Sequence, residues 1–377
     1  MSKNTPLPSH MRALVTDGPG QPLELRTVPT PEAISGTVVI KVIASLADPN
    51  LPRILKGEAG FTFPSPFTPG GRSIGRIAAV GIDTTAFVEG QLVMAEPFIR
   101  ARDDYKLRVL WGANDGFTPR EKTFMKDNWS AAAYADYVRA PLENCWALNE
   151  ERFCGKDEDG GLGLDIYDLL QLPNQLVPYG GLRGIGVQPG ERVIIAPATG
   201  MFTGAAVAVA DAMGANVIAV GRNIQVLKEL QATFPRIKIV QLKGNIEKDT
   251  AAMKAFGPVD AYIDISPPTA VNSTHLRSAF MALEPYGRVS LMGIPANDSI
   301  PVPYAIATFS SLTIRGQFMY EPSDVPAFIK LAESGLLKLG KEGGVQIVGK
   351  FGLDEVEKAF ATASANPEAG RLCMVVP

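Results

Sequence analysis

The sequence has few of the residues that build metal centres and disulfide frameworks. Three cysteines (Cys145, Cys154 and Cys373) and two histidines (His10 and His275) are spread over 377 residues. The cysteines have neither the spacing of a metal site nor that of a disulfide framework. Free cysteines are typical of a reducing compartment, so we expect a cytoplasmic protein.

The sequence also lacks an excess of charge and a membrane-spanning run. The formal net charge of −3 gives no bulk attraction to nucleic acid or acidic membranes. The start, MSKNTPLPSHMRALV, has no apolar core of a signal peptide. Pro197 and Asp211 interrupt the most apolar stretch, residues 193–223, which argues against a membrane span. We therefore expect a small-molecule substrate as the partner, and neither nucleic acid nor a membrane.

Two kinds of hydrophobic pattern follow each other along the chain, whose length suits two domains. Residues 12–150 carry short alternating apolar runs bounded by turn residues, which predict a β-rich domain. From about residue 190, continuous apolar runs alternate with helix-length segments, which predicts a parallel sheet with crossover helices. The helix and strand after residue 320 are too few to fold alone, so we expect them to return to the first domain. The predicted fold class is α/β.

A glycine-containing turn within residues 193–203 indicates a nucleotide-binding motif. Val193–Ile195 predicts a strand, after which three residues occupy positions one, three and six of G-x-G-x-x-G, with alanine for the first glycine. Glycine at the third position lets the backbone approach a pyrophosphate, and the small-residue helix that follows directs its N–H groups at phosphate. The alternative is an apolar strand–helix turn of any α/β protein. The predicted cofactor contacts of the turn are Ala198, Thr199, Gly200, Met201, Phe202 and Thr203.

The end of the second strand of this motif bears on which dinucleotide is bound. Enzymes that use NAD place an acid about 20 residues after the glycine turn, where it holds the ribose 2′-hydroxyl. Gly221, Arg222 and Asn223 stand there instead. A carboxylate would repel a 2′-phosphate, whereas a guanidinium binds it with paired hydrogen bonds. A solvated arginine after a strand is the alternative for Arg222 alone, but the three residues together predict NADP(H).

Nearly the whole chain resembles the medium-chain dehydrogenase/reductase superfamily. The segments MRALV, GTVVIKVIAS, PGGRSIGRIAAVG, AAYADYVRAPLENCWAL and YGGLRGIGVQPGERVII follow the order and spacing of that family. The resemblance implies a GroES-like catalytic domain over residues 1–178 and 321–377, and a Rossmann NADP(H)-binding domain with a doubly wound parallel sheet over residues 179–320. It also implies further cofactor contacts, of which all but the first act through the backbone: Ser266, Gly293, Ile294, Phe318 and Met319.

The sequence departs from the zinc-dependent members of this family at each catalytic ligand. Those members hold the zinc with a cysteine, a histidine beside a glutamate, and a second cysteine. The corresponding positions are Asp48, Gly71 with Arg72, and Pro173, or Asn174 if the register slips by one. Glycine and proline side chains cannot bind a metal, and Asp48 alone cannot hold zinc.

The cysteines of the family's structural zinc lobe are missing as well, because residues 101–129 fill that region without one. The sequence therefore resembles a zinc-free branch of the family, similar to quinone oxidoreductases and enoyl reductases, and we expect no metal site.

The chemistry left to a zinc-free site favours an acceptor that conjugation already activates. Without zinc no metal polarises a carbonyl, and both histidines lie outside the expected site. Hydride delivery by the cofactor then suits an enone or a quinone. Asp48 and Asn50 correspond to polar groups that zinc-free relatives place near the nicotinamide, so they are the candidate catalytic residues. A turn role for both is equally open, and Arg72 either binds an acidic substrate or pairs with Asp48.

These observations predict an NADPH-dependent, zinc-independent oxidoreductase that reduces an enone or a quinone. Two alternatives stay open: an NADP-dependent alcohol dehydrogenase or carbonyl reductase without zinc, and a catalytically silent NADPH-binding protein. The family also implies a homodimer. Residues 310–318 (SSLTIRGQF) form the apolar strand that we expect near the end of the sheet, where two copies can pair edge to edge.

Overall fold

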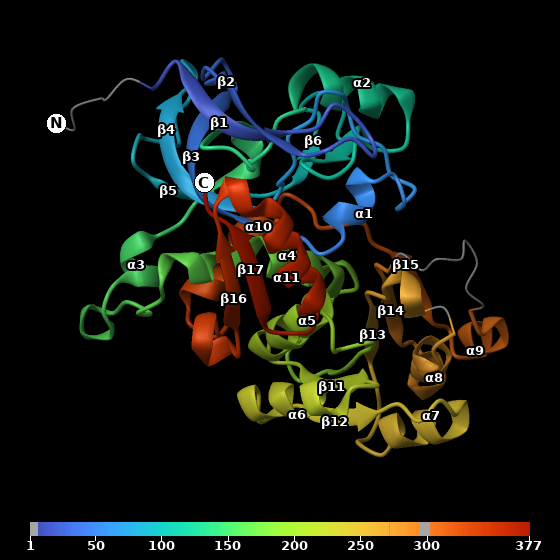
Figure 1. The fold of residues 1–377 in the computed structure, drawn as a ribbon. Coiled ribbons are helices and arrows are strands. Elements are labelled where there is room, and N and C mark those ends of the chain that lie inside the picture. The colour runs from blue at the N-terminus through green and yellow to red at the C-terminus, as the bar shows by residue number, and fades with distance from the viewer. Residues whose placement is uncertain (1–6, 271, 294–301) are drawn as a thin grey trace. The chain divides into compact units, whose positions relative to one another are not determined.

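The computed structural model describes residues 7–270, 272–293 and 302–377, and it divides into two compact units. Unit 1 comprises Met1–Pro173, Ile347–Asn366 and Leu372–Pro377. Unit 2 comprises Asn174–Gln346 and Pro367–Arg371. Segments from both ends of the chain, blue and red in Figure 1, therefore build unit 1 together.

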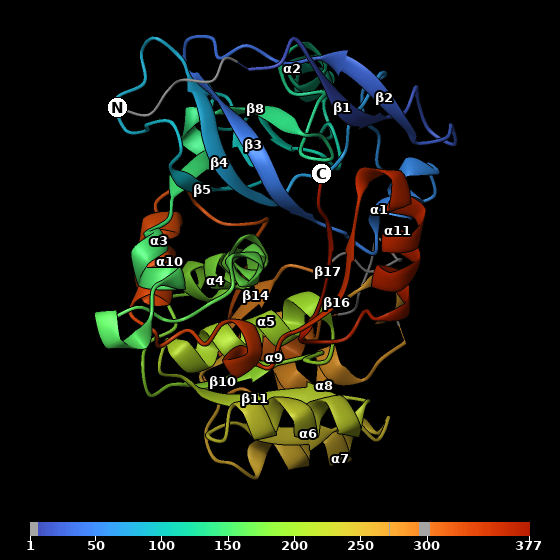
Figure 2. The ribbon, with the colours of Figure 1, turned by 60° about the vertical axis from the view of Figure 1, so that its left-hand side comes forward.

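Unit 1 is built on a sheet of seven described strands in the order β16-β17-β3-β4-β5-β9, with β8 also paired to β3. The pairings of β3 with β4, β8 and β17 are antiparallel. Figure 2 shows β16 and β17 next to α11. The strands of this sheet are β3 (Thr37–Leu46), β4 (Ser73–Val80), β5 (Leu92–Ala95), β8 (Tyr137–Pro141), β9 (Cys145–Ala147), β16 (Gln346–Phe351) and β17 (Arg371–Val375).

Two hairpin pairs and several short helices complete unit 1. The pairs are β1 (His10–Val15) with β2 (Glu24–Pro29), and β6 (Phe98–Arg100) with β7 (Arg108–Leu110). The helices are α1 (Leu51–Leu55), α2 (Pro119–Asn128), α3 (Glu150–Cys154) and α11 (Val356–Ala365), with 3-10 turns η1 (Leu142–Asn144), η2 (Asp157–Asp159), η3 (Ile166–Gln171) and η6 (Leu353–Glu355). One apolar core joins the early strands to α11, because Val38, Ile40 and Val356 belong to the same buried cluster.

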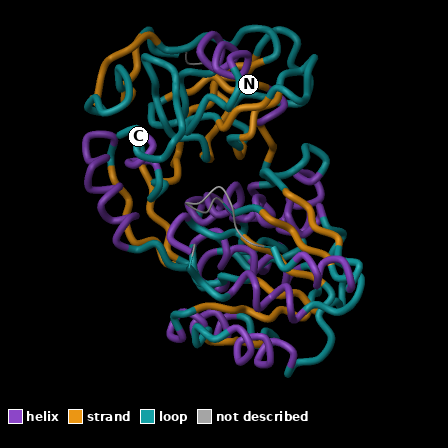
Figure 3. Tube along the Cα trace, turned by 90° about the vertical axis from the view of Figure 1, so that its right-hand side faces the viewer, coloured by secondary structure: helices purple, strands orange, loops and turns teal. Residues whose placement is uncertain are grey.

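Unit 2 is a six-stranded parallel sheet with crossover helices, and Figure 3 shows the alternation of strand and helix along it. Its strands are β10 (Arg192–Ile195), β11 (Asn216–Gly221), β12 (Lys238–Gln241), β13 (Ala261–Asp264), β14 (Arg288–Leu291) and β15 (Thr313–Gly316). Its helices are α4 (Leu172–Gly184), α5 (Met201–Ala212), α6 (Ile224–Thr233), α7 (Ile246–Lys254), α8 (His275–Ala282), α9 (Tyr304–Phe309) and α10 (Asp324–Glu333), with η4 (Pro268–Ala270) and η5 (Gly340–Gly343).

The strand order in unit 2 is β12-β11-β10-β13-β14-β15. The chain progresses outward from β10 in one direction and then restarts at β13 in the other, so the order reverses between these two strands. In open parallel sheets, ligands bind outside the carboxyl ends of the strands at such a reversal. The carboxyl ends of β10, β11 and β13 therefore define the candidate cofactor region of this unit.

Residues 321–346 group with unit 2, whereas the division at residue 320 that we derived from the sequence assigns them to the first domain. The physical reason is the packing of α10 on α4. The Tyr179 and Phe328 rings lie 5.3 Å apart between centroids, and Arg183 pairs with Asp324 at 3.6 Å. These contacts join residues distant in sequence, so no local pattern indicates them.

Candidate active site

The glycine turn follows β10 and opens α5, as its pattern predicted. Gly200 is the N-cap residue, and its N–H donates to Thr203 Oγ1 at 2.9 Å. Thr203 is buried, so its hydroxyl fastens the turn at the position where the motif usually has its third glycine. The close packing associated with that glycine shifts to Gly204, where an added Cβ would overlap Ala369 Cβ.

Residues 367–371 lie along this turn, a feature that the sequence did not indicate. The Ala369 N–H donates to the Thr199 carbonyl at 3.0 Å, and the Met201 N–H donates to the Pro367 carbonyl at 3.2 Å. The N–H groups of Gly200 and Met201 therefore already have protein acceptors. Ala198, Thr199 and Phe202 also lie in the turn, as expected, and the role of all six residues in binding a cofactor stays a prediction.

The end of β11 presents positive charge and no acid. Arg222 is exposed, and Lys243 is exposed two residues after the neighbouring β12. The two segments are tied together, because the Gln241 side chain donates to the Arg222 carbonyl at 3.2 Å and accepts from Lys243 Nζ at 2.6 Å. The Asn223 side chain is the N-cap of α6 and accepts from two backbone N–H groups of its first turn. The arrangement leaves the Arg222 side chain to face solvent at the predicted ribose position.

The end of β13 carries a buried polar network around Asp264. Its Oδ1 accepts from the Ser266 hydroxyl at 2.6 Å and lies 3.0 Å from the Tyr262 hydroxyl and 3.1 Å from His275 Nε2. Because a carboxylate only accepts, these distances place a proton on Nε2. Burial, followed by the Asp264 charge, raises the pKa of Tyr262, which therefore remains protonated. The network locks the strand end that the fold places at the reversal point.

His275 lies next to a predicted cofactor contact, and the expectation that both histidines lie outside the catalytic site stays a prediction. Its Nε2 is 2.7 Å from Ser266 Oγ, and Ser266 is one of the predicted cofactor contacts. Ser266 and His275 follow β13 and begin α8, and no local sequence pattern indicates that their side chains meet. The Nδ1 of His275 is buried without a hydrogen-bond partner in the described part of the chain.

The remaining predicted cofactor contacts follow β14 and β15. An added Cβ at Gly293 would lie 2.5 Å from the Ser266 N atom and 2.8 Å from Asp264 Oδ2, so only glycine fits there. Met319 has a left-handed φ of 60° and is buried, whereas Phe318 is half-buried. Ile294 lies outside the described residues.

In unit 1, Asp48 and Arg72 form the ion pair that the sequence suggested. Arg72 Nη1 donates to Asp48 Oδ2 at 3.2 Å. Asp48 Oδ1 meanwhile accepts from the Asn50 N–H at 2.9 Å, which is the turn role weighed for both residues. Asp48 thus stabilises the turn through Oδ1 and pairs with the Arg72 guanidinium through Oδ2.

The ion pair borders a small, mostly apolar cavity. The Arg72 side chain is 10% exposed and that of Asp48 is 24% exposed. The Arg72 carbonyl accepts from the Leu46 N–H at 2.9 Å and from the Ser45 hydroxyl at 3.0 Å, so the residue is fixed to the end of β3. The cavity measures about 20 Å³, room for roughly one water molecule. Its other lining residues are Leu46, Leu51, Ile54, Gly70, Gly71, Pro97, Leu110, Trp111, Gly112 and Ala113.

The residues at the family's metal positions do not fit a zinc ion. A Cβ on Gly71 would overlap the Trp111 carbonyl oxygen. Trp111 cannot easily yield, because its N–H donates to Pro97 O at 2.7 Å and its indole N–H donates to Ala131 O at 2.9 Å. Within residues 7–270, 272–293 and 302–377, no group of three or more His, Cys, Asp or Glu side chains is arranged to hold a metal.

Three buried amides stand at the start of α4, a group that the sequence pattern does not indicate. Gln171, Asn174 and Gln175 are each at most 6% exposed. Among the described residues, both polar atoms of the Gln171 amide and the oxygens of the other two find no hydrogen-bond partner. Buried amides normally have partners. Their spacing within an apolar segment is the signal that the sequence offers, in which Asn174 is otherwise the displaced metal-ligand position.

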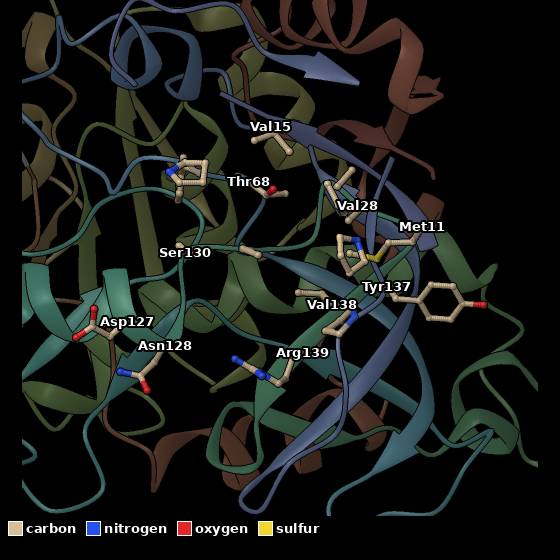
Figure 4. Close-up of a pocket in the computed structure, with 17 residues that line it drawn as sticks. Met11, Val15, Val28, Thr68, Asp127, Asn128, Ser130, Tyr137, Val138 and Arg139 are labelled. Carbon is tan, nitrogen blue, oxygen red and sulfur yellow. The ribbon is translucent and has the colours of Figure 1, made fainter. Parts of the chain in front are cut away.

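A second cavity in unit 1, of about 340 Å³, lies apart from all these residues. Its size is that of a small-ligand pocket, but none of the predicted site residues lines it. Figure 4 shows its lining, in which apolar residues of β1 and β2 face polar residues of α2 and β8: Met11, Val15, Val28, Asp127, Asn128 and Arg139.

Comparison with known proteins identifies both domains. Residues 35–150 match the model of the alcohol dehydrogenase GroES-like domain, and residues 203–334 match that of the zinc-binding dehydrogenase. The chain is 23% identical to a sorbitol dehydrogenase of Bacillus subtilis over 337 residues, 88% of each protein. It is 25% identical to an alcohol dehydrogenase of Moraxella sp. over 331 residues, 87% of this chain and 90% of that protein.

The comparison with solved structures agrees. A short chain alcohol dehydrogenase from E. coli CFT073, in complex with its cofactor NADH, aligns over 98% of this chain and 99% of its own with a TM-score of 0.74 and 18% identity. The predicted fold class, a GroES-like domain with a Rossmann domain, is thereby confirmed.

No helix in the described ranges is long and apolar enough to cross a bilayer. The two matched domains, their order and their relatives make this chain a member of the medium-chain dehydrogenase/reductase superfamily and an oxidoreductase of that type.

Proposed function

We propose that this protein interconverts an alcohol with its aldehyde or ketone, using NADP(H) and no bound zinc ion. The two relatives above are named for alcohol and polyol dehydrogenation, and neither for enone or quinone reduction. They support the carbonyl reductase that the sequence left as an alternative more than reduction of a conjugated acceptor.

The observation that carries the proposal is the environment of Gly71. The Trp111 carbonyl fills the space that a metal-binding side chain would need, and the following residue is a cation paired with Asp48. A bound zinc ion would meet a guanidinium there instead of a ligand. These contacts support a zinc-independent site within a family whose relatives include zinc-binding dehydrogenases.

The residues that follow the strands of unit 2 support NADP(H) as the cofactor. When bound, it supplies hydride chemistry that no side chain of this protein can provide. The turn Ala198–Thr203, apart from the N–H groups of Gly200 and Met201 that already have protein acceptors, would hold its pyrophosphate. Arg222 would hold the 2′-phosphate of NADP(H), with Lys243 as a second cation nearby. The absence of an acid at Gly221–Asn223 supports NADP(H) over NAD(H), although one solved neighbour binds NADH.

The proposal is tested by following the oxidation of NADPH and NADH with a panel of aldehydes, ketones, an enone and a quinone. We expect turnover of an aldehyde or ketone with NADPH, and an alcohol as the product by mass spectrometry and NMR. Turnover of the enone or quinone alone would favour the first sequence-based hypothesis. Tight NADPH binding without turnover of any acceptor would favour a silent binding protein.

A separate measurement tests the proposal that activity does not require bound zinc. Untagged protein treated with a chelator and analysed for metal should contain far less than one zinc per chain and keep its activity. Near-stoichiometric zinc that is lost together with activity would contradict the proposal.

A further inference from the structure

We propose that the second cavity of unit 1 is a binding site for an apolar α-amino acid in its zwitterionic form. The cavity measures about 340 Å³, which is the size of a small-molecule pocket. Its lining residues all lie between Met11 and Arg139, within unit 1. The site therefore belongs to one unit by itself. The proposal goes beyond the proposed function and does not rest on it.

The walls of the cavity are held in place by the rest of the unit. β1 and β2 pair with each other outside the seven-stranded sheet. Backbone bonds still fix β1, because the Leu14 N–H donates to the Tyr134 carbonyl at 2.9 Å and the Asp136 N–H donates to the Arg12 carbonyl at 3.0 Å. The Arg12 side chain also pairs with Asp136 at 2.8 Å. Arg139 stands in the β3–β8 ladder. The cavity is thus preformed, so a ligand would not have to order its walls.

One side of the cavity is apolar. Met11 and Val15, each 8% exposed, belong with Ala13 and Ala135 to a small hydrophobic cluster, and Val28 packs against it. Figure 4 shows Met11, Val15 and Val28 on the β1 and β2 side of the cavity. Apolar ligand surface that is buried here leaves water at a gain in free energy. The flexible methionine side chain can adapt to ligands of different shape.

The other side carries one positive and one negative charge. Arg139 is half-buried, and Asp127 is exposed in the last turn of α2. Among the described residues, neither side chain has a hydrogen bond or an ion pair. The Asn128 amide donates to the Phe124 carbonyl at 2.9 Å, which leaves its oxygen available as an acceptor. In Figure 4 the Arg139 side chain extends toward the side on which Asp127 and Asn128 lie.

A cation and an anion that line one cavity without pairing favour a ligand that carries both charges. A carboxylate can accept paired hydrogen bonds from the Arg139 guanidinium. An ammonium group has three donors for the Asp127 carboxylate and the Asn128 oxygen. An acid without an amine would bring a second anion to Asp127, and an amine without an acid would bring a second cation to Arg139. An aliphatic amino acid such as leucine also supplies the apolar body that suits Met11.

Four small molecules test this recognition group by group. Leucine carries all three features, whereas isocaproate lacks the ammonium group, isoamylamine lacks the carboxylate and glycine lacks the aliphatic chain. Each is titrated into the full-length protein with isotope-labelled methionine methyl groups. Leucine should shift the Met11 resonance, assigned with Met11→Leu, and leave that of Met253 in unit 2 unchanged. Its Kd should be at least about tenfold lower than that of the other three.

Two substitutions with matched controls locate the charges. Asp127→Asn and Arg139→Gln should each raise the Kd of leucine about tenfold or more. Asp103→Asn and Arg120→Gln make the same changes at exposed residues of unit 1 that do not line the cavity, so they should leave the Kd unchanged. A carboxylate in the last turn of a helix opposes the helix dipole. Asp127→Asn should therefore fold, which keeps the test valid if Arg139→Gln does not.

Several results would overturn the amino-acid site. These are no binding of leucine at about 10 mM, a Kd for isocaproate, isoamylamine or glycine as low as that for leucine, or a wild-type Kd in either folded variant of Asp127 or Arg139. None of these measurements depends on the turnover of an aldehyde or ketone, so they leave the proposed function to its own test.

Discussion

Arg222 is the residue whose removal should separate the two dinucleotides. A charge-assisted contact to a 2′-phosphate is worth about 1.5–3 kcal/mol, so Arg222→Ala should raise the Kd for NADPH roughly tenfold to a hundredfold. NADH lacks that phosphate and should bind as before. Calorimetric titration of both dinucleotides measures this, with Lys228→Ala, an exposed lysine on α6, as the control. Equal losses for both dinucleotides would make Arg222 structural, and a wild-type preference for NADH would refute NADP(H).

A carboxylate introduced at residue 223 should shift the preference of the protein from NADPH toward NADH. Asn223 caps α6, and aspartate is an equally good N-cap, so Asn223→Asp should preserve the helix. Its charge should repel the 2′-phosphate and raise the Kd for NADPH, whereas NADH should bind no more weakly. Position 221 is less suitable, because a Cβ there would lie 2.7 Å from Thr199 Cγ2. Unchanged NADPH affinity in a variant with wild-type Tm would place the 2′-phosphate elsewhere.

Single residues differ in how well the sequence revealed them. The Asp48–Arg72 contact was predictable, because the family spacing placed the two positions at one site and their charges are opposite. The contact of His275 with Ser266 was not, since it depends on how the loop between β13 and α8 folds back. The exposed cation at Arg222 was visible because the residue follows a strand of continuous apolar residues.

At the scale of secondary structure, the strands that are buried on both faces are the elements that the sequence predicts. β10, β11 and β13 are almost fully buried apolar runs, and such runs from about residue 190 onward are the pattern that predicts a parallel sheet. The assignment of residues 321–346 differed from the structure because α10 is attached by contacts to α4 that leave no periodic signal. The segment 367–371 likewise pairs with the glycine turn through backbone bonds, which any residue type can make.

The packing of α5 on that segment makes a prediction of its own. Gly204→Ala adds a Cβ that would overlap Ala369, and such overpacking costs about 1–3 kcal/mol. Chemical denaturation should show this loss, and the double variant Gly204→Ala/Ala369→Gly should recover part of it. Gly316→Ala is the control, since its added Cβ meets nothing within 4 Å. Full stability of Gly204→Ala would mean that the segment 367–371 moves aside freely.

At the scale of the whole molecule, the edge strand β15 supports the predicted homodimer. All four of its residues are exposed, including Ile314 at 38%, and nearby α9 exposes Tyr304 and Phe309 at 83% and 89%. An uncovered strand edge with apolar neighbours is suited to pairing with a second copy. We expect light scattering to give the dimer mass for the wild type and the monomer mass for Ile314→Asp. Ile82→Asp, at an isoleucine that is 97% exposed in unit 1, should remain dimeric, and a monomeric wild type would refute the prediction.

The place of β17 in the chain affects how the protein folds during synthesis. Its partner β3 leaves the ribosome early, whereas β17 follows every other described element. The end of β3 at Ser45 and Leu46 therefore lacks this partner until β17 has been made, and an unpaired strand edge readily recruits other chains. The residues just before β17 also fasten the glycine turn of the other unit. Both units thus reach their final form only when the same short stretch has emerged, so a stalled or truncated product should be a substrate for chaperones and proteases and not a half-active enzyme.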